Sequence, residues 1–531
     1  MTTRGTNIKL LVATLLSLLL LSEFLLRLYG VELRIFLSGM SRKNKVSSYS
    51  EKFITDAKNF HVTEKTFNIY FLGESTVWGV PYDPQLSLPS IVDYRLGGTL
   101  SGRPVRVINL SSPAKDSAYV HFVFELLLRK KEIFHPSLIV IYSGHNEFLK
   151  FHPAEPDFHQ SVLRWMAYHS ELARELLTLI ARSKGEISEM DLRDFSDKSI
   201  FPFDPHGYEK VINRYRKYFL SMVKLAEKEK IQILISTLVS NYSTWEPNRS
   251  VYCSSSAALA QKKQFSQDFN MGMKAEKQQD YSSALTAYQK ALSICDEFAE
   301  VYFREGKVYQ SLNEFGKAWD AYQKAIDYDG MPIRASSAQN NFILSLKRDH
   351  VHVIDSVDYL RQHLPDALLD DGLIIDGVHP NLEGYLLIGE AIADKIHSLF
   401  GSSQDQLKPL TLDTAKKIFQ LDQSKMFEVS YSTGRWITRL ASWRYDRTER
   451  LKTAEDFFHQ AIEIDPKRYE GYTGLAMTSF MKEDGMAAEN FLQKSLMIDG
   501  KHTEEYFHKP WNRKILKRFS VKSSIPVPTF F

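Results

Sequence analysis

Cysteine is scarce in this sequence, with only Cys253 and Cys295 in 531 residues. Two cysteines exclude a disulfide-rich scaffold and a zinc site built from cysteine thiolates. They leave room for one disulfide if the chain lies in an oxidising compartment. That bond would close the base of the helical insert described below. We expect no metal site and no cofactor.

Excess charge of one sign is also missing. The 67 lysines and arginines nearly balance the 64 aspartates and glutamates, for a net charge of +3, and no dense basic stripe occurs. We therefore expect no nucleic-acid partner. Hydrophobic residues make up 44% and charged residues 25%, which are values of globular proteins. The length exceeds what one ordinary core accommodates, so it predicts two or three domains.

An uncharged run, Leu10–Ser22, lies near the N-terminus. If Glu23 and Arg27 pair at the membrane interface, the run extends to about Tyr29 and approaches the roughly 20 residues of a spanning helix. No small-x-small cleavage site follows, which favours an uncleaved membrane anchor over residues 1–30 rather than a signal peptide. The flanking positive charges do not settle which side of the membrane the chain occupies.

The stretch Thr66–Gly79 (TFNIYFLGESTVWG) combines an apolar strand pattern with a small, polar end. The apolar run breaks at a glycine, and Ser75 follows two residues later. Because α/β sheets bind ligands at the carboxyl ends of their strands, Ser75 is a candidate functional residue. About 300 residues further on, Asp376 precedes His379 by three positions. This pair supplies the base and the orienting carboxylate that a serine nucleophile needs.

Short apolar segments and amphipathic helical segments alternate along much of the chain. The segments of buried-strand type are residues 67–72, 105–110, 137–143, 231–239 and 351–357. The helical patterns cover residues 116–134, 165–182, 208–230 and 382–400. This alternation predicts an α/β fold with a parallel sheet covered by helices on both faces.

A repeat with a period of 34 residues interrupts the alternation. Four aromatic or small residues recur nearly in kind: Tyr281, Ala284, Tyr288 and Ala291 return as Phe315, Ala318, Tyr322 and Ala325. This pattern resembles tetratricopeptide (TPR) repeats, here at residues 265–298 and 299–332. A second pair is expected at 435–502. The resemblance implies all-α helical modules that bind a protein partner.

Four short blocks of small and polar residues lie near the ends of expected strands. They are Gly73–Thr76, Asn109–Ala114, Gly144–Glu147 and Asp376–Pro380. Their order resembles the SGNH/GDSL hydrolase family, which implies a flavodoxin-like three-layer α/β fold for ester hydrolysis and acyl transfer. The resemblance covers residues 65–250 and 335–400. One pair of repeats, 265–332, is then inserted before the last strand, and the other is appended.

The resemblance also implies roles for individual residues. Ser75 is the nucleophile, His379 its general base, and Asp376 the residue that orients the imidazole. The oxyanion hole is expected from the backbone N–H groups of Ser75 and Ala114 and from the side-chain amide of Asn146.

Ala114 departs from the family pattern, which usually has glycine there. Alanine keeps the N–H group, provided that the position does not require a positive φ. A shift in register would move the role to Ser111 or Ser112.

Each of these residues also has a purely structural interpretation. Asn146 could cap a turn after its strand, and Asp376 could cap the helix that follows it. For Arg334, where the insert rejoins the α/β domain, a surface salt bridge is favoured over contact with a polar or anionic substrate.

The sequence therefore predicts a membrane-anchored serine esterase of SGNH type that hydrolyses acyl esters, with acetyl favoured. The substrate is an acylated small molecule or glycan, and the repeats bind a protein partner. From family resemblance, we expect a single-pass membrane protein with its catalytic domain outside the cytoplasm, in the periplasm. One alternative is an O-acyltransferase acting on a glycan. Another is a TPR scaffold with an inactive SGNH-like platform.

Overall fold

The computed structural model describes residues 62–148, 205–253 and 255–516, except for 443, 445, 446, 510 and 514. These residues belong to one compact unit. The anchor predicted at residues 1–30 and the helix predicted at 165–182 lie outside the described residues.

The predicted membrane localisation needs a correction. None of the helices in the described ranges combines the length and the apolar composition that crossing a bilayer requires. The single-pass membrane protein expected from the sequence is therefore not supported, and membrane location takes no part in the proposals below.

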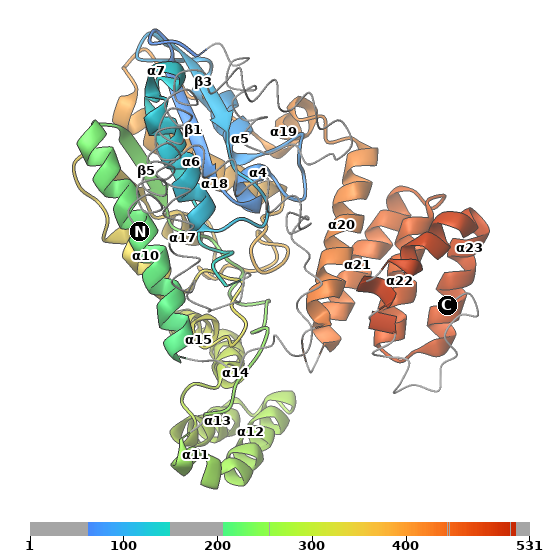
Figure 1. Ribbon diagram of the computed structural model, residues 1–531. Helices are drawn as coiled ribbons and strands as arrows, with labels where there is room; N and C mark the ends of the chain where they lie inside the picture. Colours follow the sequence, from blue (N-terminus) through green and yellow to red (C-terminus); the bar gives the residue numbers. More distant parts are fainter. Residues whose placement is uncertain are drawn as a thin grey trace, which may run out of the picture. The chain divides into compact units, whose positions relative to one another are not determined.

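A sheet lies at the centre of the α/β part (Figure 1). It has six strands in the order β2-β3-β1-β4-β5-β6. The strands are β1 (Phe67–Gly73), β2 (Thr99–Leu100), β3 (Arg103–Asn109), β4 (Leu138–Tyr142), β5 (Gln232–Ser236) and β6 (Val351–Ile354). All neighbours pair in parallel except β2 and β3. In chain order the five parallel strands run 2-1-3-4-5, which is the flavodoxin-like arrangement. The predicted α/β fold with a parallel sheet is confirmed.

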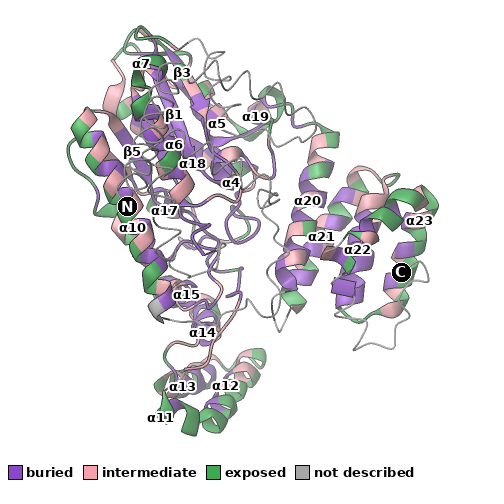
Figure 2. Ribbon diagram, viewed as in Figure 1, coloured by how far each residue is buried: buried purple, intermediate pink, exposed green. Residues whose placement is uncertain are grey.

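The two central strands carry the core. Every residue of β1 and β4 is buried, and Figure 2 shows β1 in the colour of buried residues. A strand covered on both faces has no solvent side, which explains why both segments are continuously apolar. Their register pairs Gly73 with Tyr142, so the two carboxyl ends lie side by side. The strand order reverses at this point, where doubly wound sheets bind ligands.

Helices cover both faces of the sheet. They are α5 (Leu88–Leu96), α6 (Ser117–Arg129), α7 (Lys131–Phe134), α10 (Pro205–Glu229), α16 (Ser337–Leu344), α17 (Ser356–Arg361) and α18 (Leu382–Phe400). Helices α5 and α18 pack together, and α6 packs on α10. Gly389 of α18 makes the first contact possible, because a β-carbon there would lie 2.4 Å from Ile91 of α5.

The inserted segment is helical, as the 34-residue period predicts. Its helices are α11 (Ser256–Ala260), α12 (Lys262–Lys277), α13 (Tyr281–Ile294), α14 (Ala299–Ser311) and α15 (Phe315–Asp327). A β-carbon at Gly272 would lie 2.4 Å from the ring of Tyr288, and one at Gly306 would lie 2.6 Å from the ring of Tyr322. The period therefore repeats one contact, in which an aromatic ring fills the space left by a glycine.

The C-terminal region uses the same packing. After α19 (Leu412–Ile418) come α20 (Gln423–Ala441), α21 (Thr448–Ile464), α22 (Tyr469–Met481) and α23 (Gly485–His508). Helix α20 packs on α21, and α22 packs on α23. The ring of Phe458 lies against two glycines, Gly434 and Gly474, where β-carbons would come within 2.8 and 2.3 Å of it.

The two cysteines form a disulfide, as the sequence analysis allowed. Cys253 and Cys295 are bonded, with their Cα atoms 5.5 Å apart. The bond joins the chain just before α11 to the end of α13, and so it closes the base of the insert. Such a constraint on the unfolded chain is worth about 2–4 kcal/mol.

The packing of glycine against tyrosine gives a testable prediction. Replacing Gly306 by alanine should force the ring of Tyr322 out of place and destabilise α14 and α15 by about 1–3 kcal/mol. Gly316→Ala is the matched control, because a β-carbon there meets nothing within 4 Å. Hydrogen exchange of residues 299–327 measures the effect. Faster exchange is expected for Gly306→Ala alone, and equal protection in both variants would contradict the packing account.

Candidate active site

Ser75 lies where β1 leaves the sheet. It begins the short helix α4 (Ser75–Trp78), and its side chain is partly exposed. A glycine precedes this turn because a β-carbon at Gly73 would lie 2.4 Å from the carbonyl oxygen of Tyr142 on the neighbouring strand. Since the first N–H groups of a helix have no partner within it, the N–H of Ser75 is available. None of the described residues accepts a hydrogen bond from it.

His379 and Asp376 reach Ser75 from the loop before α18. Nε2 of His379 lies 2.8 Å from Oγ of Ser75, and its Nδ1 lies 2.7 Å from Oδ2 of Asp376. The other carboxylate oxygen of Asp376 accepts the backbone N–H groups of Val378 and His379, both at 2.7 Å. The structure thus brings together all three residues that the sequence singled out.

The carboxylate of Asp376 stays ionised although it is buried. Burial raises its pKa, but the charge of His379 and the hydrogen bonds to Asp376 outweigh that effect, and the net pKa is lowered. An ionised carboxylate accepts the Nδ1–H of the ring and so directs the lone pair of Nε2 toward Ser75. In this arrangement His379 can take a proton from the hydroxyl group.

Asn146 follows β4 at the same edge of the sheet. Its side-chain nitrogen Nδ2 is buried and has no hydrogen-bond partner among the residues that the structure describes. Its backbone N–H donates to Oε2 of Glu74 at 3.1 Å, which fixes the residue beside the turn that carries Ser75. An amide donor without a partner is costly in a protein interior unless a ligand or water uses it.

The block Asn109–Ala114 supplies one backbone donor. The N–H of Ser111 donates to the side chain of Asn109, and that of Ser112 donates to the carbonyl of Gly73. For the N–H of Ala114, no acceptor occurs in the described part of the chain. These contacts favour Ala114 over either serine as the donor.

Ala114 does not meet the condition set for it in the sequence analysis. Its φ is +58°, in the left-handed region that favours glycine and costs other residues roughly 1–2 kcal/mol. The position therefore does require a positive φ, and alanine occupies it under strain.

Glu74 is a residue of the site that sequence reasoning missed. It is 2% exposed and accepts hydrogen bonds from the hydroxyl of Ser143 at 2.6 Å and from the N–H of Gly144 at 2.8 Å. Burial, followed by the charge of Glu147, raises its pKa well above the usual range. Through these bonds Glu74 ties the end of β1 to the loop after β4. Its position directly before Ser75 was the only signal in the sequence.

The segment that follows the insert donates two hydrogen bonds to the polar block Gly144–Glu147. The N–H of Ala335 donates to Nδ1 of His145 at 3.2 Å, and Nε2 of Gln339 donates to the carbonyl of Gly144 at 2.7 Å. Gly144 has a φ of +149°, and a β-carbon there would lie 2.5 Å from Leu238. The insert thus returns to the α/β domain directly against the loop that carries Asn146.

Arg334 corrects an expectation from the sequence. It is 2% exposed and donates to the carbonyls of Asn241 at 2.8 Å and Trp245 at 2.6 Å. Its partner Asp329, 3.8 Å away, is equally buried. The surface salt bridge predicted for Arg334 is therefore wrong. The N–H of Asn241 in turn donates to the carbonyl of Gly377, so Arg334 supports the loop that carries His379.

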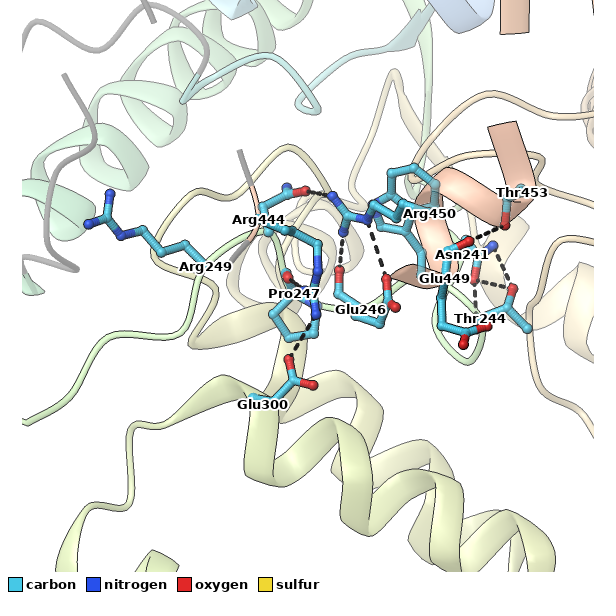
Figure 3. A network of polar contacts seen from close by, with 12 residues as sticks. Asn241, Thr244, Glu246, Pro247, Arg249, Glu300, Arg444, Glu449, Arg450 and Thr453 are labelled. Atoms are coloured by element: carbon cyan, nitrogen blue, oxygen red, sulfur yellow. Dashed lines mark hydrogen bonds and ion pairs between the residues drawn. The ribbon is translucent and has the colours of Figure 1, made fainter. Parts of the chain in front are cut away.

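A buried arginine of the C-terminal repeats meets the same region (Figure 3). The guanidinium of Arg450 in α21 lies 4.1 Å from the ring centre of Trp245. It donates to the side chains of Glu246 at 3.3 Å and Asn248 at 2.6 Å. Because these residues follow β5, the appended repeats and the α/β domain share one polar network.

Arg444 connects this network to the insert. Its guanidinium donates to the carbonyl of Pro247 and lies 3.3 Å from the carboxylate of Glu300 in α14 (Figure 3). The backbone N–H of Glu300 also donates to Oγ of Ser250 at 2.8 Å, so both repeat modules contact the loop that follows β5. That loop lies against the histidine loop, since a β-carbon at Gly377 would be 3.1 Å from Nε1 of Trp245.

Trp436 of α20 is a second residue that sequence reasoning missed. Its ring centre lies 6.4 Å from that of His379, with the planes inclined at 71°. The sequence shows only an aromatic residue in a predicted repeat, and nothing in that pattern indicates a contact with residue 379.

The described residues contain no group of three His, Cys, Asp or Glu side chains that could hold a metal ion.

Comparison with known proteins finds one matching family model and several similar solved structures. A tetratricopeptide repeat family model matches residues 299–330. A GDSL-like lipase from Bacteroides thetaiotaomicron is 13% identical, with 66% of this chain and 98% of that chain covered and a TM-score of 0.30. A lipase/acylhydrolase from Enterococcus faecalis is also 13% identical, with 65% and 100% covered and a TM-score of 0.28.

Repeat proteins match as well. YrrB, a TPR protein with an unusual peptide-binding site, is 15% identical, with 47% of this chain and 95% of that chain covered and a TM-score of 0.14. No curated protein matches. The family model supports a TPR repeat within the insert. The structural matches, at these identities and TM-scores, carry no argument, so the conclusions below rest on the geometry of the site.

The buried ring of His145 predicts a dependence of stability on pH. Burial, followed by the charge of His379, lowers its pKa to about 3. Below pH 6.5 the unfolded chain binds a proton that the folded chain does not. Stability is therefore lost as the pH falls from about 6.5 toward 3, by up to about 1.4 kcal/mol per pH unit.

Urea unfolding at pH 7 and pH 5 measures this effect. His145→Gln keeps an acceptor for the N–H of Ala335 but does not titrate, so it should lose less stability on acidification than the wild type. His363→Gln, at an exposed position, is the control and should behave like the wild type. Equal losses in His145→Gln and wild type would refute the account.

Proposed function

We propose that this protein is a serine esterase of SGNH type that hydrolyses acyl esters. The observation that carries the proposal is the hydrogen-bonded chain Asp376–His379–Ser75 at the carboxyl ends of β1 and β4. A serine hydroxyl is a weak nucleophile alone and becomes effective beside an oriented base. The same arrangement, in which a buried carboxylate orients a histidine that is hydrogen-bonded to a serine, occurs on several unrelated folds.

The reaction follows from these contacts. Oγ of Ser75 attacks the ester carbonyl while Nε2 of His379 takes its proton, and Asp376 stabilises the imidazolium that forms. Collapse of the tetrahedral intermediate expels the alcohol, which receives the proton from His379. Water then attacks the acyl-enzyme with the same histidine as base, and the carboxylic acid leaves.

Three donors are proposed to stabilise the oxyanion. They are the backbone N–H groups of Ser75 and Ala114 and the Nδ2 amide of Asn146. Support comes from their lack of acceptors among the described residues, since a donor held without a partner needs no reorganisation when charge develops.

The proposal also includes the identity of the acyl group and the role of the inserted repeats. We take the acyl group to be acetyl, which the sequence analysis favoured. The inserted repeats, which include the matched residues 299–330, are proposed to bind a protein partner.

Acetyl-ester hydrolysis by single variants tests the function. Ser75→Ala or His379→Ala should lower kcat by about a millionfold, and Asp376→Asn should cost less, about 10⁴-fold. Asn146→Ala should lower kcat by roughly 10²–10³-fold with little change in KM, because its amide meets the substrate oxygen only as charge develops.

Two surface variants are the controls, Ser282→Ala in α13 and Asn213→Ala in α10, both at exposed positions. They should retain wild-type turnover. Undiminished hydrolysis by Ser75→Ala would reject the serine mechanism and leave the scaffold interpretation.

A further inference from the structure

The C-terminal repeats form a partly open cavity of about 260 Å³ between α20 and the end of α23. We call it the cationic cavity, and its lining residues are Ser432, Arg435, Trp436, Thr438, Arg439, Tyr506, Lys509, Trp511 and Asn512. Its volume lies just below the usual range for small-molecule sites. It therefore suits one small ring with its substituents rather than an extended chain.

The charged side chains that line this cavity are all positive. Arg435, Arg439 and Lys509 line it, and its lining contains no carboxylate. In the part of the chain that the structure describes, neither Arg435 nor Lys509 forms an ion pair, and both are exposed. Cations gathered in a concave site attract anions, since the low-dielectric walls focus their field. The charge therefore favours a ligand with a carboxylate, sulfate or phosphate group.

Flat rings provide the remaining walls. Trp436, Tyr506 and Trp511 line the cavity together with hydroxyl and amide side chains, and the guanidinium of Arg439 lies 4.9 Å from the ring centre of Trp511. Aromatic faces bordered by polar groups suit a ligand that has both an apolar face and hydrogen-bonding edges. An acidic sugar has both features together with a negative charge.

The cavity adjoins the candidate active site through one side chain. Trp436 lines the cavity and also contacts the ring of His379. When the ester carbonyl of a substrate lies at Ser75, the side chain of Trp436 therefore lies between the general base, His379, and the cavity.

Helix α20 is held beside the α/β domain by apolar contacts. Trp245 and Ile333 of the α/β domain share one buried cluster with Phe427 and Ile437 of α20, and Trp436 packs against that cluster. Lys425 at the start of α20 donates to the carbonyl of Asp83. The cavity is therefore fixed relative to the site rather than being a feature of a separate module.

We propose that the cationic cavity binds an anionic group on the same substrate whose ester bond reacts at Ser75. The substrate class is then an acyl ester of an acidic sugar. This inference rests on the proposed function and extends it. The appended repeats become part of the substrate site, with Arg435 and Lys509 as specificity-determining residues.

A matched pair of substrates tests the proposal. Methyl O-acetyl-glucuronoside and methyl O-acetyl-glucoside differ only in a carboxylate in place of a hydroxymethyl group. In the wild type, kcat/KM for the acidic substrate should exceed that for the neutral one by about tenfold or more, because charge-assisted hydrogen bonds contribute that much. Added sodium chloride should reduce the ratio. Inorganic sulfate and phosphate as competitors distinguish which anion the cavity prefers.

The variant Arg435→Gln/Lys509→Gln removes two cations of the cavity, and its ratio of acidic to neutral kcat/KM should fall to about one. Comparing the two substrates within each variant cancels any general loss of activity. Lys494→Gln in α23 is the control, because Lys494 is exposed and lies outside the cavity lining. It should keep the wild-type ratio. A ratio of about one in the wild type, or an unchanged ratio in the double variant, would overturn the proposal.

Binding without turnover separates this inference from the proposed function. Methyl glucuronoside, titrated into Ser75→Ala and followed by tryptophan fluorescence, should bind about tenfold more tightly than methyl glucoside. The preference should disappear when Arg435→Gln and Lys509→Gln are added. If Ser75→Ala abolishes hydrolysis but shows no such preference, the esterase proposal stands and the cavity proposal fails. If a short acidic peptide binds more tightly than the glucuronoside, the cavity is a peptide site and the proposal is likewise refuted.

Discussion

The hydrogen bond between Ser75 and His379 joins residues 304 positions apart in the sequence, and most of the fold serves to make it possible. Ser75 is fixed by the end of β1, and His379 by the loop before α18. Between them the chain completes four further parallel strands and one helical insert. The strand order reverses between β1 and β4, so their carboxyl ends present Ser75 and Asn146 at one edge. Parallel pairing with this order is therefore the constraint on which the candidate site depends.

The two repeat modules contact this site through buried polar groups rather than by linkers alone. Ala335, directly after the insert, donates to His145, while Arg450 of the appended repeats stacks on Trp245 beside the histidine loop. Burial lowers the pKa of Arg450 to about 9. A buried arginine is tolerated only where acceptors surround it. Glu246 and Asn248 supply these acceptors, so the contact between the appended repeats and the α/β domain depends on the exact position of Arg450.

The sequence revealed the features that depend on local pattern. Continuous apolar runs marked β1 and β4 because both faces of these strands are buried, and the recurring tyrosines marked the repeats because each fills the space beside a glycine. It did not reveal Glu74, Trp436 or the burial of Arg334. Those residues contact partners 57 to 93 positions away in the sequence, and such pairings appear only once the chain has folded. The predicted membrane localisation, which rested on the apolar run near the N-terminus and on family resemblance, is not supported by the helices of the described residues.

Covalent labelling tests the central claim most directly, namely that Ser75 is a nucleophile activated by His379. A fluorophosphonate reacts with activated serines, and mass spectrometry of the digested protein identifies the modified residue. The account predicts one label, on the peptide that contains Ser75. Labelling should be absent in Ser75→Ala and strongly slowed in His379→Ala, with both variants folded. A label on another serine, or none on the folded wild-type protein, would contradict it.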